Sequence, residues 1–207
     1  MLRILGKASS INVRKVLWTC GEIGLPFDRE DWGSGFASTE TAAFLAINPN
    51  GQVPVIEDEG GFLWESNTIC RYLAGKHGRT DLLPALPGDR ARVERWMDWQ
   101  ATDLNGAWRY AFAALVRRDP SCQDPAQIEA SVRGWNAKMG ILEQQLAATG
   151  TFVTGNVFTL ADIVLGLSVN RWLMTPLARP GYPAVMAYHE RLRERPAFLE
   201  HGCNGIP

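Results

Sequence analysis

The chain changes character once, across residues 78–88, and this change limits the folds open to it. The segment reads Gly-Arg-Thr-Asp-Leu-Leu-Pro-Ala-Leu-Pro-Gly, and its glycines and prolines favour turns. Before it, short strand patterns alternate with helical patterns; after it, the patterns are long, helical and poor in strand formers. The 207 residues suffice for two small domains. We therefore predict an α+β domain over 1–77, a linker over 78–88 and an all-helical domain over 89–207.

The first domain is predicted to have the order βαβ, then α, then ββα. The expected elements are a strand at 2–6, a helix at 11–24, a strand at 26–31, a short helix at 40–47, strands at 53–57 and 62–64, and a helix from 66 to about 77. The short helix must end at Asn48-Pro49, because proline cannot continue it. In the second domain, apolar residues at helical spacing predict helices at 89–118, 125–147, 160–173 and 183–194.

Charge and cysteine usage exclude several classes of protein. The 21 basic and 22 acidic residues leave a net charge of −1, which gives no general attraction to nucleic acid or acidic membranes. The four cysteines form no Cys-x-x-Cys pair, which disfavours a zinc site and a dithiol redox motif. The first seven residues lack the apolar run of a signal peptide, and charged residues interrupt the most apolar stretch, 160–178. We expect a cytoplasmic protein without a metal, a nucleic-acid partner or a membrane span.

Ser9-Ser10-Ile11-Asn12 stands where the first strand gives way to the first helix. A serine there can simply cap the helix, by accepting a hydrogen bond from an unpaired backbone N–H group. The same position suits an anion, and a hydroxyl that donates to a thiolate favours the ionised form of the thiol. A free thiol has a pKa near 8.5, so such help matters at neutral pH.

Two further motifs have a structural and a functional interpretation. In Asn50-Gly51-Gln52-Val53-Pro54-Val55, the Val-Pro pair entering a strand suits a cis proline, which leaves a free edge to which an extended peptide can bond. In Glu65-Ser66-Asn67, we expect Ser66 to be the N-cap of the next helix. The same pair could hold the carboxylate and the ammonium of an amino-acid head group. By contrast, Thr159-Leu160-Ala161-Asp162 is a variant capping box, an element of folding.

Together these motifs resemble the cytosolic glutathione S-transferases, over essentially the whole chain. The matching positions are Ser10-x-Asn12-Val13-x-Lys15-Val16, Asn48-Pro49-Asn50-Gly51-Gln52-Val53-Pro54, Glu65-Ser66-x-x-Ile69-x-x-Tyr72-Leu73 and Thr159-x-x-Asp162. The resemblance implies a thioredoxin-like first domain, an all-helical second domain and a homodimer. It also implies an enzyme that adds glutathione to a small electrophile in detoxification, with hydroperoxide reduction as a further activity.

The resemblance also assigns roles by position. Ser10 resembles the catalytic serine of the theta- and phi-like, bacterial-type members, with Ser9 and Asn12 as rivals. The residues that resemble the glutathione-binding set are Gln52, Val53, Pro54, Glu65 and Ser66. Val53 corresponds to the backbone partner of the cysteinyl residue, and Glu65 and Ser66 to the partners of the γ-glutamyl group.

One departure from the family pattern concerns the glycyl carboxylate of glutathione. Plant-like members have a His-Lys pair where this chain has Thr39-Glu40. Arg14, Lys15 or the partner subunit are the candidates to supply the missing positive charge. A non-catalytic module that binds glutathione or apolar ligands is the alternative function, and the missing pair slightly favours it.

The resemblance places the electrophile site between the domains. Candidates to line it are Trp32, Asp103, Trp108, Arg109 and Phe112. Aromatic residues at helical spacing are more often core residues, which is the competing interpretation. Arg109 beside Trp108 suggests an anionic or aromatic electrophile.

Overall fold

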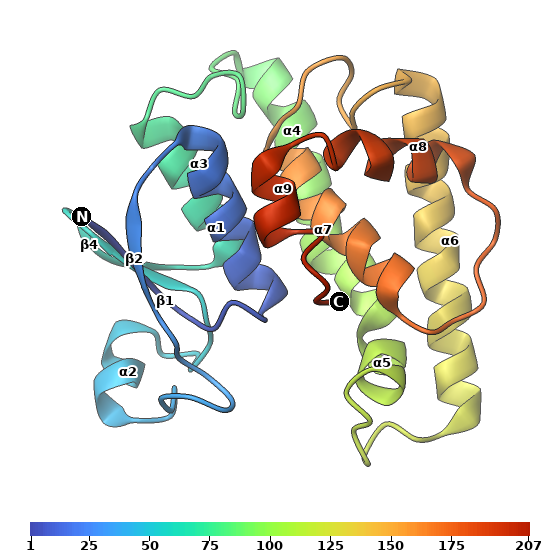
Figure 1. Cartoon of the computed structure of the whole chain (residues 1–207), viewed down its shortest axis with the longest axis horizontal. Helices are drawn as coiled ribbons and strands as arrows, with labels where there is room; N and C mark the ends of the chain where they lie inside the picture. The colour runs from blue at the N-terminus through green and yellow to red at the C-terminus, as the bar shows by residue number, and fades with distance from the viewer.

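The computed structural model describes residues 1–207 and contains two domains that pack side by side (Figure 1). The first domain consists of β1 (Leu2–Leu5), α1 (Ile11–Ile23), β2 (Phe27–Glu30), α2 (Ala42–Ile47), β3 (Val55–Asp58), β4 (Gly61–Trp64) and α3 (Ser66–Lys76). The second consists of α4 (Pro87–Trp99), the π-helical turn η1 (Gln100–Leu104), α5 (Asn105–Leu115), α6 (Pro125–Thr149), α7 (Leu160–Met174), α8 (Pro183–Leu192) and α9 (Pro196–His201). The predicted fold class, thioredoxin-like and then all-helical, is confirmed.

The sheet of the first domain has the strand order β2-β1-β3-β4. Strands β1 and β2 are parallel, as their crossover through α1 requires, and the other pairs are antiparallel. Helices α1 and α3 pack against each other on the side of the sheet that faces the second domain, and α2 lies on the other side (Figure 1). There Phe44 of α2 packs with Leu5 and Val55 in a small separate cluster.

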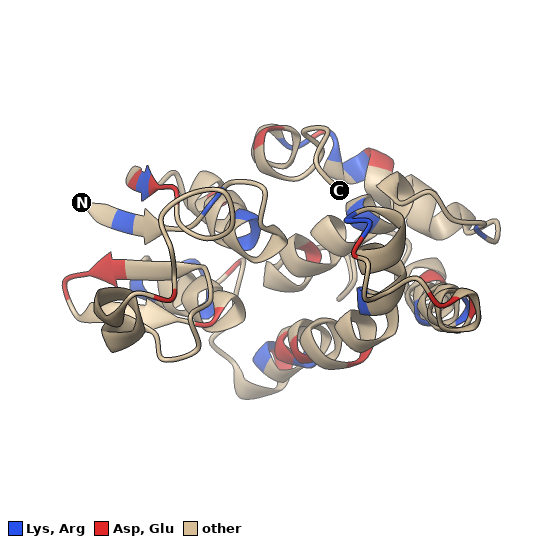
Figure 2. Ribbon diagram, turned by 90° about the horizontal axis from the view of Figure 1, so that it is seen from below, with Lys and Arg blue, Asp and Glu red and all other residues tan.

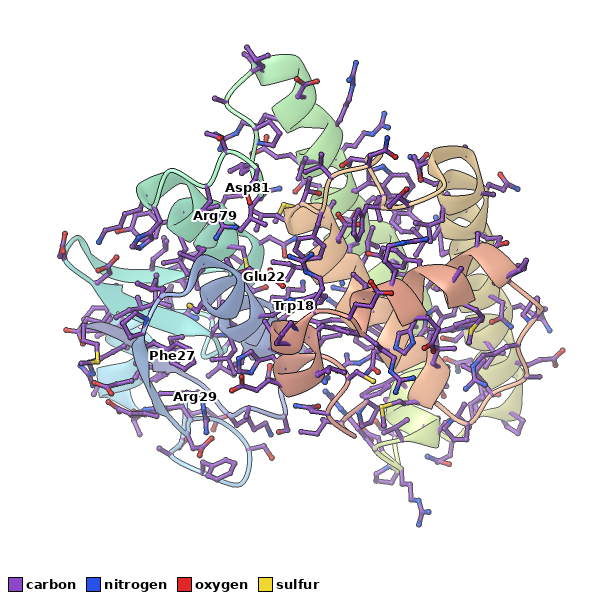
Figure 3. The ribbon with its side chains drawn as sticks, turned by 45° about the horizontal axis from the view of Figure 1, so that its top comes forward. Trp18, Glu22, Phe27, Arg29, Arg79 and Asp81 are labelled. Atoms are coloured by element: carbon purple, nitrogen blue, oxygen red, sulfur yellow. The ribbon has the colours of Figure 1, made fainter.

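A single apolar core runs through both domains, because α1 packs against α7 and α9. The ring of Trp18 on α1 lies 4.7 Å from that of Phe198 on α9. Gly166 on α7 allows the Trp18 ring to approach α7 closely, since a Cβ atom at this position would lie 2.9 Å from that ring. The indole of Trp18 donates to Glu22 at 2.7 Å (Figure 3). Glu22 also accepts from Arg195 of the second domain at 2.9 Å. The domains are therefore joined by packing and by an ion pair.

The capping box at the start of α7 forms as predicted. Both the backbone N–H and the hydroxyl of Thr159 donate to the carboxylate of Asp162, at 2.8 and 3.1 Å. Phe158 and Ile163 are buried on either side of it, where a hydrophobic staple would place them. Asp162 also accepts from the backbone of Val153 at 2.9 Å, so it fixes the loop before α7.

Three details differ from the prediction. The helix expected over 89–118 is interrupted by η1 and ends at Leu115, and α9 was not foreseen. Ser66 is the first residue of α3 and not its N-cap; the N-cap is Glu65, with φ of 74°.

The Val53-Pro54 peptide bond is cis, as its sequence suggested. No helix has both the length and the apolar character needed to cross a bilayer.

Candidate active site

Two adjoining clefts lie where the first domain meets α5. The smaller has a volume of about 620 Å³ and the larger of about 1070 Å³. Both are lined by Asn12, Gln52, Val53, Asn105 and Arg109, so they form one continuous depression. The residues that the resemblance assigns to the thiol or to the glutathione-binding set each line at least one of them; these are Ser9, Ser10, Asn12, Gln52, Val53, Pro54, Glu65 and Ser66.

Ser10 lies in the larger cleft, at the N-terminus of α1. Its backbone has the extended conformation of an N-cap, but its side chain makes no capping hydrogen bond. The hydroxyl of Ser10 is therefore free to donate to a ligand, and the positive end of the α1 dipole lies beside it. Ser9 and Asn12 line the same cleft, and Ser9 is the more exposed of the two serines.

Val53 presents an unused backbone edge to both clefts. Neither its N–H nor its C=O is hydrogen-bonded within the chain. The buried Asn48 holds this edge in place, because its amide donates to the carbonyl of Gln52 at 2.8 Å. Gly51 has φ of 59°, a conformation that favours glycine, and it lies against the backbone of Thr39. The edge is thus held rigidly and available to an extended peptide.

Glu65, Ser66 and Asn67 line the smaller cleft at the N-terminus of α3. The positive φ of Glu65 is uncommon for a residue with a side chain and turns the chain sharply from β4 into α3. Ser66 is the first residue of α3, and the side chain of the N-cap residue Glu65 makes no capping hydrogen bond. The side chain of Asn67 is held by the second domain, since its amide donates to the carbonyl of Met97 on α4 at 2.9 Å.

Lys15 lies beneath this cleft and is 1% exposed. Its ammonium donates to Asn67 Oδ1 at 3.1 Å and to Gln100 Oε1 at 2.8 Å. Burial lowers the pKa of Lys15 to about 8. Arg14 is buried too, but its guanidinium donates to backbone oxygens of Ile206 and Pro207, both at 2.8 Å. Thr39 lines the larger cleft, whereas Lys15 lines only the smaller one and Arg14 lines neither.

Trp108, Arg109 and Phe112 of α5 line the larger cleft, as expected. Two arginines that sequence reasoning missed join them, Arg117 and Arg171. The guanidinium of Arg171 lies 4.6 Å from the centre of the Trp108 ring and 4.2 Å from that of Phe112. Nothing in the helical spacing of α7 distinguishes Arg171, because nearly the whole helix is buried.

The structure places two predicted lining residues elsewhere. Trp32 packs against Phe44, with ring centres 5.1 Å apart, and does not line either cleft. Asp103 faces α6, where it accepts from Lys138 at 2.6 Å. Asp103 belongs to η1, whose wider turn changes the direction of the side chains along the helix, so spacing counted from a regular helix misplaces it.

Comparison with known proteins shows the family. Residues 9–76 match the glutathione S-transferase N-terminal domain and residues 106–196 the C-terminal domain. The chain is 37% identical to glutathione S-transferase GstB of Escherichia coli K12 over 199 residues, which cover 95% of both chains. It is 32% identical to glutathione S-transferase 3 of Zea mays, over 95% of this chain and 91% of that one.

A solved structure matches the whole fold. The theta class glutathione S-transferase of Xanthomonas axonopodis pv. citri, crystallised with glutathione bound, superposes with a TM-score of 0.90 at 35% identity. The match covers 100% of this chain and 99% of that one.

Proposed function

The chain belongs to the glutathione S-transferase family, and we propose that it adds the thiol of glutathione to a small electrophile, using Ser10 to stabilise the thiolate. The observation that carries this proposal is the free hydroxyl of Ser10, which caps no helix and opens into the cleft that Val53 and Asn12 share. A serine kept for folding would use its hydroxyl to satisfy the helix terminus.

Glutathione is proposed to lie along the backbone edge of Val53. Its cysteinyl residue would exchange hydrogen bonds with the free N–H and C=O of Val53, as a short antiparallel strand does. Its γ-glutamyl end would enter the smaller cleft, where Ser66 and the N-terminus of α3 meet the carboxylate and Glu65 meets the ammonium. Gln52 would contact the peptide, and Pro54 shapes the turn beneath it. The Xanthomonas relative was crystallised with glutathione bound, which supports glutathione as the ligand.

The glycyl end would then extend toward Thr39, which lies against Gly51. Lys7 is the cationic side chain that the first domain contributes to this larger cleft, and its ammonium donates to the carbonyl of Ser34 at 2.9 Å. We assign to Lys7 the contact with the glycyl carboxylate that a His-Lys pair makes in plant-like members.

Catalysis follows from this arrangement. The hydroxyl of Ser10 donates to the sulfur and favours the thiolate, and the thiol proton leaves to solvent. The thiolate attacks the electrophilic carbon, the C–S bond forms, and a leaving group such as chloride departs with its electron pair. Holding both reactants in adjoining clefts supplies most of the remaining acceleration. With a hydroperoxide, the thiolate would attack oxygen, and a second glutathione would complete the reduction to alcohol, water and glutathione disulfide.

The test is a titration of bound glutathione, following the ultraviolet absorbance of the thiolate against pH in the wild type and in Ser10→Ala. We expect a thiol pKa well below that of free glutathione in the wild type and close to it in Ser10→Ala. Ser9→Ala is the matched control and should behave as the wild type. A lowered pKa that survives in Ser10→Ala but not in Asn12→Ala would transfer the role to Asn12.

Binding without any lowering of the thiol pKa would favour the alternative, a non-catalytic module. The homodimer that the family resemblance implies is part of the proposal and is measured by light scattering on the same preparations.

A further inference from the structure

The charges of the larger cleft point to one class of electrophile. Resting on the function proposed above, we propose that the cleft selects electrophiles that carry a carboxylate on an aromatic ring. Three arginines, Arg109, Arg117 and Arg171, line it from the second domain, together with Lys7 from the first. No aspartate or glutamate side chain lines it. Elsewhere, basic and acidic residues are mixed on both domains (Figure 2), so the excess of positive charge belongs to the cleft.

Arg171 is the innermost of these cations and is 3% exposed. It forms no ion pair, and its Nε atom is buried without a hydrogen-bond partner. Burial, together with the neighbouring charges of Arg14 and Arg117, lowers the pKa of Arg171 to about 9. A buried charge without a counterion is costly, so an anion that enters the cleft relieves this cost.

The backbone oxygen of Pro207 is a hydrogen-bond acceptor close to Arg171. It accepts from Arg171 at 3.4 Å and from Arg14 at 2.8 Å. A negative charge on this oxygen would balance only one positive charge, and the guanidinium of Arg14, which lies closer to it than that of Arg171, already provides one. Arg109 and Arg117 would still have no counterion within the cleft.

The arginines are arranged around aromatic rings. Arg117 lies 5.4 Å from the centre of the Phe112 ring, and Arg171 lies over the same ring and over Trp108. Arg109 follows Trp108 directly, makes no hydrogen bond or ion pair within the chain, and stands where the two clefts meet. An aromatic acid matches this pattern, since its ring can pack against Trp108 and Phe112 while its carboxylate faces Arg109 and Arg117.

The test compares two electrophiles that differ at one substituent, the anionic 4-chloro-3,5-dinitrobenzoate and the neutral 4-chloro-3,5-dinitrobenzamide. In both, the glutathione sulfur bonds to the ring carbon and chloride leaves with the C–Cl electron pair. We expect kcat/KM, divided by the uncatalysed rate constant, to favour the benzoate by about tenfold, the effect of one hydrogen bond to a charged group. Added salt should reduce this preference.

Arg117→Leu should lower the benzoate-to-benzamide ratio toward one. Arg133→Leu is the matched control, because Arg133 is an exposed arginine of α6 that pairs with Glu129 and lines neither cleft. It should leave the ratio as in the wild type. Equal rates for the two compounds in the wild type, or an unchanged ratio in Arg117→Leu, would overturn the inference.

A binding measurement separates this inference from the proposed function. Calorimetry with the unreactive 3,5-dinitrobenzoate and 3,5-dinitrobenzamide needs no chemistry and no thiolate. Tighter binding of the benzoate, lost in Arg117→Leu, supports the anion site even if Ser10 proves not to activate glutathione. Equal binding of the two compounds refutes the site and leaves the proposed role of Ser10 intact.

Discussion

Lys15 and Gln100 are 85 residues apart in the sequence, yet the Lys15 ammonium donates to Gln100 Oε1 at 2.8 Å in the interior of the protein. Lys15 lies on α1 of the first domain and Gln100 begins the π-helical turn of the second. The contact therefore joins the two halves of the site below its surface, at a kind of helical irregularity that is frequent near functional sites.

A chain of hydrogen bonds extends from this contact in both directions. On one side Lys15 donates to Asn67, the neighbour of Ser66. On the other side Gln100 donates to Asn105 at 3.0 Å, and Asn105 accepts from the indole of Trp108 at 2.9 Å. The residues proposed to hold glutathione and those proposed to hold the electrophile are thus positioned by one buried network.

Substitution of Lys15 by methionine tests this network. Asn67 and Gln100 lose their shared donor, and the side chain of Asn67 is then held only by its hydrogen bond to the Met97 carbonyl. We expect KM for glutathione to rise more than kcat falls, because Lys15 positions the binding site and does not contact the reacting sulfur. Steady-state kinetics of Lys15→Met measure this split. Lys138→Met, on the surface of α6, is the control. A loss confined to kcat would contradict the assignment.

The same lysine predicts a pH dependence of stability. Burial lowers the pKa of Lys15 from 10.5 to about 8. Between these values the unfolded chain keeps a proton that the folded chain has released, so the free energy of unfolding rises with pH. The rise due to Lys15 amounts to at most about 3 kcal/mol. Urea unfolding from pH 7.5 to 10.5 should show it in the wild type relative to Lys15→Met; a constant difference between the two would refute it.

The motifs at the junctions of elements allowed much of the site to be predicted. Ser10, Val53 and Ser66 each stand where a strand and a helix meet, and in this fold those junctions face the two adjoining clefts. Short-range patterns are enough to locate such positions, because they depend on where an element begins and not on how the elements pack.

Arg117 and Arg171, which line the larger cleft, could not be predicted in the same way. Arg171 of α7 and Trp108 of α5 meet only in the folded chain, and no local pattern encodes that contact. The error at Asp103 has a related cause, since a regular helical period was assumed across the π-helical turn of η1. Trp32 was predicted to line the electrophile site from the first domain, whereas its ring packs against Phe44 of α2.

The assignment of Lys7 to the glycyl carboxylate gives a prediction that uses a modified ligand. The wild type should bind glutathione more tightly than its glycyl monoethyl ester, by about three- to tenfold, because the ester lacks the charge that Lys7 meets. Lys7→Ala should bind the two ligands equally. Competition calorimetry measures both constants, and Lys138→Ala serves as the control. A preference that persists in Lys7→Ala would place the cation elsewhere, with the partner subunit as the next candidate.

Asp162 gives a prediction on stability that leaves the clefts untouched. Its buried carboxylate accepts from the backbone N–H groups of Val153 and Thr159 and from the hydroxyl of Tyr188 at 3.1 Å. Alanine at position 162 leaves these donors buried without a partner, and we expect the free energy of unfolding to fall by about 3 to 5 kcal/mol. Asp162→Asn keeps one acceptor oxygen and should lose less. Because Asp162 lines neither cleft, the folded fraction of either variant should lower the thiol pKa of glutathione as the wild type does. A raised thiol pKa in folded Asp162→Asn would show instead that the capping box also helps to position the site.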